Sequence, residues 1–319
     1  MPLPKSYKLA SGYSIPALGF GCANTTTESN LAALKIGLRL FDTAWVYGTE
    51  RCVGEAIKKS GVPRNEIFLT TKVHNWHHEP DMLRKAVADS MDRLGVDFLD
   101  LVLIHWPVAT VPTQKGREID LSLIEVPKSG QGPNGEQLVE KDKDGNDLIN
   151  EELTTNHVSS WRALEELVDA GKIRSIGVSN FSIDQIEKLR PHVRHPICLN
   201  QCEATPALPN NKLLSYCQEN EIVFQAYSPL GSRIKLENNP IIIKLSKDNN
   251  MTPQSLVISW GLQRGTSVLT KSNNEERLKG NIDVRELSAD VVSALNDLDH
   301  SGQKRAIPGH PYMKQIWDE

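Results

Sequence analysis

Short runs of aliphatic and β-branched residues alternate with longer amphipathic stretches along most of the chain. A run of about four to eight apolar residues bounded by turn residues is typical of a strand buried on both faces. Apolar residues that recur at intervals of three and four indicate a helix instead. The pattern predicts eight strands, over residues 16–21, 38–42, 67–72, 99–105, 175–179, 197–201, 222–227 and 267–271.

Amphipathic stretches between these runs predict helices, for example over residues 82–94, 159–170, 183–189, 212–220 and 253–263. Two of these helices have clear boundary signals. Gly171 follows the second, and the last opens with Thr252 as N-cap and Pro253 at the first helical position. A small hairpin around Ser11 and Gly12 is expected to precede the first long strand.

Eight strands that are each followed by a helix predict an α/β fold of the (β/α)8 TIM-barrel type. The alternative is a doubly wound sheet that binds a dinucleotide at a glycine-rich turn. Gly19 and Gly21 supply a Gly-x-Gly at a strand end, but position 24 is Asn24, so the third glycine of that fingerprint is absent. The barrel is therefore the favoured fold.

One segment, over residues 109–155, breaks the regular spacing because it is rich in glycine, proline and charged residues. We interpret it as a long βα loop inserted into a single domain that spans residues 1–319. The segment directly follows the strand that ends at His105, so it is expected on the carboxyl face of the barrel, where active sites form. The alternative is a solvated insertion without a role.

Composition excludes several classes of protein. Apolar residues make up 39% of the chain and charged residues 24%, which is enough to build a sizeable core and unlike a disordered chain. The formal charge of -4 offers no basic excess, so nucleic acid and anionic membranes are not expected as partners. The chain has five cysteines without a CxxC pair, and no apolar run reaches membrane-spanning length. Residues 1–21 contain no apolar run of secretory length, so export by that route is not expected. A protein of the reducing cytoplasm is expected.

Polar residues stand at the ends of three neighbouring strands. Asp42 ends the second predicted strand with Tyr47 just beyond it, Lys72 ends the third, and His105 ends the fourth. Taken singly, they can be a helix cap, a half-buried aromatic, a surface cation and a core histidine. Together, Lys72 would lower the pKa of the Tyr47 phenol, Asp42 would keep the ammonium charged, and His105 would donate to a carbonyl oxygen. The group predicts a site that protonates an oxygen.

With these residues in place, the chain resembles the aldo-keto reductases, a family of NADP(H)-dependent carbonyl reductases built on a (β/α)8 barrel. Matching stretches cover nearly the whole chain, at residues 15–21, 41–44 with Tyr47, 97–107, 171–181, 200–201, 227–231 and 271–272. The resemblance implies that Tyr47 is the proton donor in reduction, that Asp42 and Lys72 tune it, and that His105 orients the carbonyl.

The resemblance also implies the cofactor contacts. Tyr227 would stack on the nicotinamide, while Ser179, Asn180 and Gln201 would hold its carboxamide. Further contacts are expected from Gly21, Cys22, Ser228, Leu230, Ser232, Lys271, Ser272, Asn273, Arg277 and Asn281. Lys271 and Arg277 are two cations that could clamp a phosphate, which favours NADP(H), with NAD(H) as the alternative cofactor.

The chain departs from the family pattern at two positions. Where many members have Thr-Trp, it has Cys22-Ala23, which predicts a wider pocket, and Gly280 stands where an acidic residue often meets the adenine. Ala23, Val46 and Trp106 are the expected substrate contacts. By resemblance the tail at residues 303–319 closes over the substrate.

Two questions stay open at the level of sequence. A metal site at His74, His77, His78 and Glu79 is disfavoured because their spacing fits no closed site. The long insertion resembles that of the fungal xylose and glycerol reductases. The expected partner is therefore a small carbonyl compound or alcohol. By resemblance, the enzyme is expected to be a monomer. A polyol dehydrogenase that works in the oxidative direction and a non-catalytic cofactor-binding subunit are the alternatives.

Overall fold

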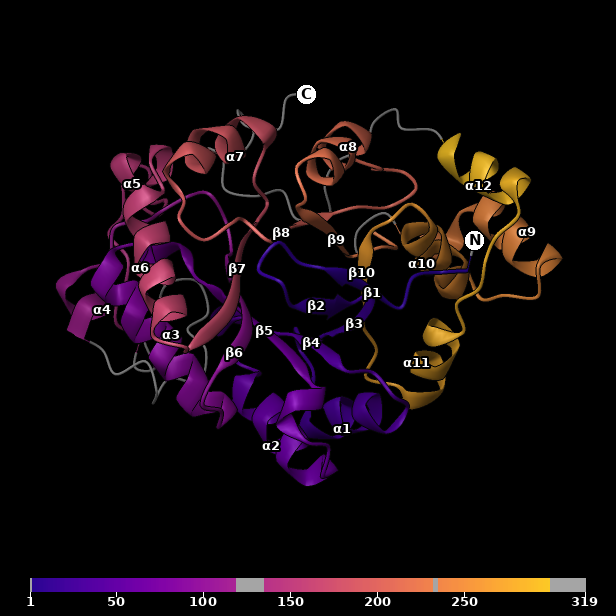
Figure 1. Cartoon of the computed structure of the whole chain (residues 1–319), viewed down its shortest axis with the longest axis horizontal. Helices are drawn as coiled ribbons and strands as arrows, with labels where there is room; N and C mark the ends of the chain where they lie inside the picture. Colours follow the sequence, from indigo (N-terminus) through magenta and orange to yellow (C-terminus); the bar gives the residue numbers. More distant parts are fainter. Residues whose placement is uncertain (1, 119–134, 232–234, 299–319) are drawn as a thin grey trace.

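A computed structural model describes residues 2–118, 135–231 and 235–298. Eight parallel strands form a closed barrel in the order β10, β3, β4, β5, β6, β7, β8 and β9. The (β/α)8 prediction is therefore confirmed, and Figure 1 shows the strands at the centre with helices around them. The barrel strands are β3 (Leu18–Gly21), β4 (Leu40–Asp42), β5 (Phe68–Val73), β6 (Leu99–Ile104), β7 (Ile173–Ser179), β8 (Leu199–Glu203), β9 (Val223–Tyr227) and β10 (Ser267–Thr270).

A helix follows each strand and packs on the outside of the barrel. These helices are α1 (Thr27–Lys35), α2 (Glu50–Ser60), α3 (Pro80–Leu94), α6 (Val158–Asp169), α7 (Ile183–Leu189), α8 (Asn211–Glu219), α10 (Pro253–Gln263) and α11 (Glu275–Ile282). Two more helices, α9 (Pro240–Asp248) and α12 (Ala289–Asn296), lie on the outer side. Helix α10 begins where predicted, because the Thr252 side chain caps it by accepting a hydrogen bond from the Ser255 N–H.

The predicted hairpin forms from β1 (Ser6–Lys8) and β2 (Ser14–Pro16), which pair antiparallel. Its side chains Leu9 and Ile15 are buried in one cluster with the barrel-interior residues Leu40 and Leu101. Pro16 belongs to β2 and not to the first barrel strand, which begins at Leu18. The hairpin therefore fills the barrel from the end where the strands begin, and leaves the carboxyl end open to a site.

The described parts of the insertion between β6 and α6 contain more regular structure than the sequence suggests. It carries two short helices, α4 (Gln114–Glu118) and α5 (Glu151–Thr155), and isolated bridges such as Thr110 to Ile149. Leu138 and Val139 are fully buried against Trp45 and Trp76 beyond the ends of β4 and β5. For these residues the alternative of a solvated insertion is wrong, because apolar side chains anchor them to the carboxyl face, where the loop is expected. The tail at residues 303–319 lies outside the described residues.

Within the described ranges, no helix is both long and apolar enough to cross a membrane.

Candidate active site

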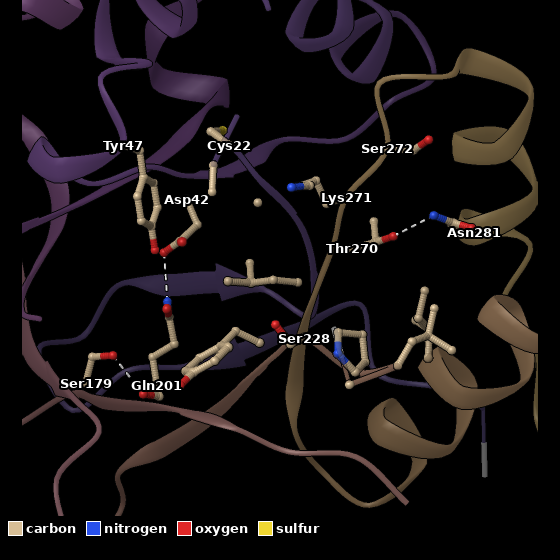
Figure 2. Close-up of a pocket in the computed structure, with 18 of the residues that line it drawn as sticks. Cys22, Asp42, Tyr47, Ser179, Gln201, Ser228, Thr270, Lys271, Ser272 and Asn281 are labelled. Carbon is tan, nitrogen blue, oxygen red and sulfur yellow. Dashed lines mark hydrogen bonds between the residues drawn. The ribbon is translucent and has the colours of Figure 1, made fainter. Parts of the chain in front are cut away.

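A cavity of about 420 Å³ opens at the carboxyl ends of the barrel strands. Most of the residues chosen from the sequence line it, and Figure 2 shows several of them converging from opposite sides. The lining includes Gly21, Cys22, Ala23, Asp42, Tyr47, His105, Trp106, Ser179, Asn180, Gln201, Tyr227, Ser228, Leu230, Lys271, Ser272, Arg277 and Asn281. Ser232 lies outside the described residues. The fold thus brings together segments that are distant in sequence.

Asp42 and Lys72 form a buried ion pair beneath the cavity. The Lys72 Nζ lies 2.5 Å from Asp42 Oδ1 and donates a second hydrogen bond of 2.9 Å to the Thr43 carbonyl oxygen. Burial tends to lower the pKa of Lys72, but Asp42 and Tyr47 outweigh burial, so its pKa is raised. Burial raises the pKa of Asp42 against the opposing effect of the ammonium. Lys72 is therefore held as a cation, and it does not itself line the cavity.

Tyr47 is positioned by a single turn of 3-10 helix over Trp45–Tyr47 that follows β4. Gly48 ends this turn with a φ of 63°, a left-handed conformation that favours glycine. The turn places the Tyr47 ring with its centroid 5.0 Å from the Lys72 Nζ and 5.6 Å from the centroid of the His105 ring. The phenol, the ammonium and the imidazole therefore form one compact group at the cavity.

The expected direction of the Tyr47 pKa needs correction. Burial raises the pKa of the phenol above 10, and the Lys72 charge, which lowers it, does not overturn that effect. The reason is that Asp42 lies against Lys72, and its negative charge acts on the phenol in the opposite direction. In the cofactor-free protein Tyr47 is thus held as a neutral phenol, which can donate a proton.

His105 follows β6, the strand beside the one that carries Lys72, and lines the cavity. Burial lowers the pKa of its imidazole well below the ordinary value, and the nearby Lys72 charge acts in the same direction. The ring is therefore neutral at physiological pH. Its Nδ1 is buried and has no hydrogen-bond partner in the described residues, so Nε2 is the nitrogen available to a ligand.

Three strand ends form a second group beside the first. Asn180 follows β7 with a φ of 64°, and its Oδ1 accepts a 2.9 Å hydrogen bond from the Tyr227 hydroxyl. The Ser179 hydroxyl donates to the Gln201 carbonyl oxygen over 2.9 Å, and the Gln201 side-chain amide donates to Asp42 over 2.7 Å. These contacts hold an aromatic face and a buried amide in fixed positions at the cavity wall.

The other end of the cavity carries positive charge. Lys271 and Arg277 both line it and are exposed, and neither has a carboxylate partner among the described residues. Asn281 is buried and donates to Thr270 Oγ1 over 3.0 Å. Asn273 does not line the cavity, because its side-chain amide donates to the Asn24 carbonyl oxygen over 2.9 Å instead. The two cations are thus available to an anionic group.

Of the three expected substrate contacts, Ala23 and Trp106 line the cavity. Val46 does not, because it packs against the cluster of Trp45, Trp76 and the insertion. A side chain on the 3-10 turn before Tyr47 can face either the cavity or the insertion, and sequence spacing does not distinguish them.

Sequence reasoning missed other lining residues, including Gln254, Ile258, Leu269 and Thr270. Gln254 and Ile258 stand four residues apart near the start of α10, so they share one face of that helix. The N-cap at Thr252 is the signal that could have found them, since helices that follow barrel strands begin at the carboxyl face. Leu269 and Thr270 end β10 directly before Lys271.

The histidines near the end of β5 do not form a metal centre. In the part of the chain that the structure describes, no three His, Cys, Asp or Glu side chains are arranged to hold a metal ion. His77 instead accepts a hydrogen bond from the Trp76 indole over 2.5 Å, and its ring meets that of Trp45 edge to face. This group packs beneath the insertion.

Comparisons with known proteins agree with this geometry. Glycerol 2-dehydrogenase (NADP(+)) of Saccharomyces cerevisiae is 38% identical over 96% of this chain and 94% of its own length. Aldehyde reductase YPR1 of the same organism is 39% identical, over 94% of this chain and 93% of its own. The solved structure of the aldose reductase from Schistosoma japonicum matches with a TM-score of 0.82 and 29% identity, covering 97% of each chain.

The Aldo/keto reductase family pattern matches residues 24–300, which include the cavity residues from Asp42 to Asn281. The chain is an oxidoreductase that belongs to the aldo/keto reductase family.

Proposed function

We propose that the enzyme reduces the carbonyl group of an aldehyde, a sugar or a ketone to an alcohol, with NADPH as hydride donor and Tyr47 as proton donor. The observation that carries this proposal is the compact group of Tyr47, His105 and the buried Asp42–Lys72 ion pair at the cavity. The names of the relatives, an aldehyde reductase and an NADP(+)-dependent glycerol dehydrogenase, support the same chemistry.

The residues at the cavity fit NADP(H). The half-buried Tyr227 offers an aromatic face, and Gln201 and Asn180 offer amide groups beside it. Lys271 and Arg277 offer two cations without carboxylate partners at the far end, which suits a phosphate monoester. When bound, NADPH supplies the hydride. The protein contributes orientation, since holding two reacting groups at near-attack distance can be worth several kcal/mol, about 7–11 at most.

Each catalytic residue has a defined part in the proposed reaction. The neutral His105 donates a hydrogen bond from Nε2 to the carbonyl oxygen and so orients the substrate. As negative charge develops on that oxygen, the Tyr47 hydroxyl gives up its proton to it. The Lys72 ammonium stabilises the phenolate that is left behind, and Asp42 keeps Lys72 charged and in place.

We infer that reduction is the favoured direction at neutral pH. Alcohol oxidation would use the same groups but needs Tyr47 as a phenolate, and burial raises the pKa of this phenol above 10. Small polyols, sugars and their aldehydes are the proposed substrates, and a polyol dehydrogenase is the alternative. A monomeric enzyme of the cytoplasm remains our working proposal.

The test is a substrate panel. NADPH consumption is followed with short aldehydes, aldoses, uronates and aromatic aldehydes, and NADP+ reduction is followed with glycerol and other polyols. We expect turnover of at least one carbonyl class that exceeds the oxidation of the matching alcohol at pH 7. Faster oxidation at that pH would favour the dehydrogenase, and tight NADPH binding without any turnover would favour a non-catalytic role.

The choice of NADP(H) over NAD(H) gives a second prediction. Replacing Lys271 or Arg277 by methionine removes a charge-assisted contact of about 1.5–3 kcal/mol with the phosphate. Each variant is expected to bind NADPH at least about tenfold more weakly while its affinity for NADH changes less than about twofold, as measured by fluorescence titration. Lys279→Met is the matched control on α11, because Lys279 pairs with Glu275 and Glu276 and does not line the cavity. Equal weakening of both cofactors would overturn the phosphate assignment.

A further inference from the structure

A chain of buried hydrogen bonds crosses the barrel interior beneath the cavity. The Gln201 side-chain amide nitrogen on β8 donates to Asp42 Oδ2 on β4 and to Gln225 Oε1 on β9, both over 2.7 Å. The Gln225 amide nitrogen donates to the Ser267 hydroxyl on β10 over 3.0 Å, and that hydroxyl donates to the Pro16 carbonyl oxygen over 3.4 Å. The four residues whose side chains form this series of hydrogen bonds, Asp42, Gln201, Gln225 and Ser267, are each at most 2% exposed.

Strand register explains how these side chains meet. Gln201 stands directly opposite Gln225 in the β8–β9 pair, and Gln225 stands directly opposite Ser267 in the β9–β10 pair. Side chains at matched positions of parallel strands point to the same side of the sheet, here into the barrel. Gln201 then reaches across the interior to Asp42, as the dashed line in Figure 2 shows.

The groups at both ends of this series of hydrogen bonds are acceptors. This determines which way the hydroxyl and the two amides between them point. The Pro16 carbonyl can only accept, so the Ser267 hydroxyl donates its proton there and accepts from the Gln225 amide nitrogen. The Gln225 oxygen is then turned toward Gln201. At the other end the Asp42 carboxylate, already paired with Lys72, also accepts.

The orientation of the Gln201 amide follows from these two acceptors. Its nitrogen has two N–H groups, and Asp42 and Gln225 take one each. Within the described residues no donor reaches Gln201 Oε1, so the oxygen is the end of the amide left for a ligand in the cavity. If Gln225 were apolar, one N–H of Gln201 would lose its buried acceptor, and the amide would be free to rotate or flip.

We propose that Gln225 is a positioning residue that acts through Gln201. It presents the Gln201 oxygen to the carboxamide of the nicotinamide and helps to keep Asp42 in place against Lys72. This inference rests on the proposed function, because it takes NADP(H) as the ligand of the cavity. Gln225 itself does not line the cavity, so it acts without touching the cofactor.

The experiment compares two ligands by isothermal titration calorimetry. NADP+ carries the nicotinamide, whereas adenosine 2′,5′-bisphosphate carries only the adenosine end and its phosphates. Gln225→Met is expected to lower the affinity for NADP+ about five- to tenfold, which is the equivalent of one buried hydrogen bond. The affinity for the bisphosphate is expected to stay within about twofold of the wild-type value. Gln225→Glu, whose fully buried carboxyl is expected to be protonated, keeps an acceptor toward Gln201 and a donor toward Ser267, and is expected to stay within about twofold of the wild type for both ligands.

A second variant keeps the proposal testable if Gln225→Met folds poorly. Ser267→Ala removes the hydroxyl that orients the Gln225 amide. It is therefore expected to lower the affinity for NADP+ and not that for the bisphosphate, by a smaller factor than Gln225→Met does. Equal weakening of both ligands, or unchanged NADP+ affinity in a folded Gln225→Met protein, would overturn the role of Gln225. Failure of the wild-type protein to bind NADP+ at all would instead overturn the proposed function.

Discussion

Replacing Tyr47 by phenylalanine is expected to lower kcat for carbonyl reduction by about 10²- to 10⁴-fold, the usual worth of a positioned general acid. The variant removes only the hydroxyl, so the ring still packs between Lys72 and His105. The affinity for NADPH is therefore expected to stay within about twofold of the wild type. Steady-state kinetics on the best carbonyl of the panel and a fluorescence titration of NADPH measure the two quantities.

Tyr13→Phe provides the matched control, because Tyr13 is exposed on the N-terminal hairpin, away from the cavity. The pH dependence separates the proton-transfer role from a packing role. With the pKa of Tyr47 raised above 10, reduction is expected to stay insensitive to this group between about pH 6 and 9, while oxidation increases with pH. A Tyr47→Phe protein that keeps the wild-type kcat would contradict the assignment of Tyr47 as proton donor.

The protein is expected to lose stability steeply as the pH falls from about 6.5 to 4. Burial lowers the pKa of His74 and of His157 to about 4, and lowers the pKa of His77 and His78 well below the ordinary value. Below pH 6.5 the unfolded chain binds protons on these histidines and the folded chain does not, so the free energy of unfolding falls with the pH. For a single histidine with a folded pKa of about 4, the loss at pH 4 is about 3 kcal/mol.

Urea unfolding at a series of pH values between 7 and 4 measures this effect. His157→Gln is expected to reduce the fall in the free energy of unfolding between pH 7 and pH 4 by about 3 kcal/mol. This difference holds even if the substitution lowers the stability at pH 7 through lost packing on Phe181. His192→Asn is the matched control, because His192 is exposed, and it should leave the pH dependence unchanged. A free energy of unfolding that stays constant from pH 7 to 4 would show that these histidines are not held neutral by burial.

Two of these histidines also connect the site to the insertion. His74 and His77 pack with Trp45 and Trp76, against which the insertion residues Leu138 and Val139 are buried. Trp45 begins the 3-10 turn that carries Tyr47. Protonation of this cluster is therefore expected to loosen the insertion and the support of Tyr47 together.

Much of the fold and the proposed catalytic group could be predicted because the signals are local. Apolar runs separated by helical stretches indicated all eight strands, and a barrel places the residues that follow those strands at one face. Asp42, Tyr47, Lys72 and His105 could therefore be grouped from their positions at strand ends alone. The cap at Thr252 and Pro253 likewise determines where α10 begins, because it depends on neighbouring residues only.

Features that depend on which side chains meet in space required the tertiary structure. The net pKa of Tyr47 depends on how deeply the phenol is buried and on Asp42 lying against Lys72, and neither can be read from spacing. Asn273 and Val46 stand at the predicted positions but turn to Asn24 and to the insertion cluster.

Gln225 gave no signal in the sequence. Its role depends on the register of three strands and on a proline carbonyl contributed by the hairpin. Residue type and position at the strand ends were thus enough to predict from the sequence which side chains form the site. Its proton affinities and the orientation of its amides were decided by burial and by pairings between residues up to about 250 positions apart, because desolvation and hydrogen bonding act through space.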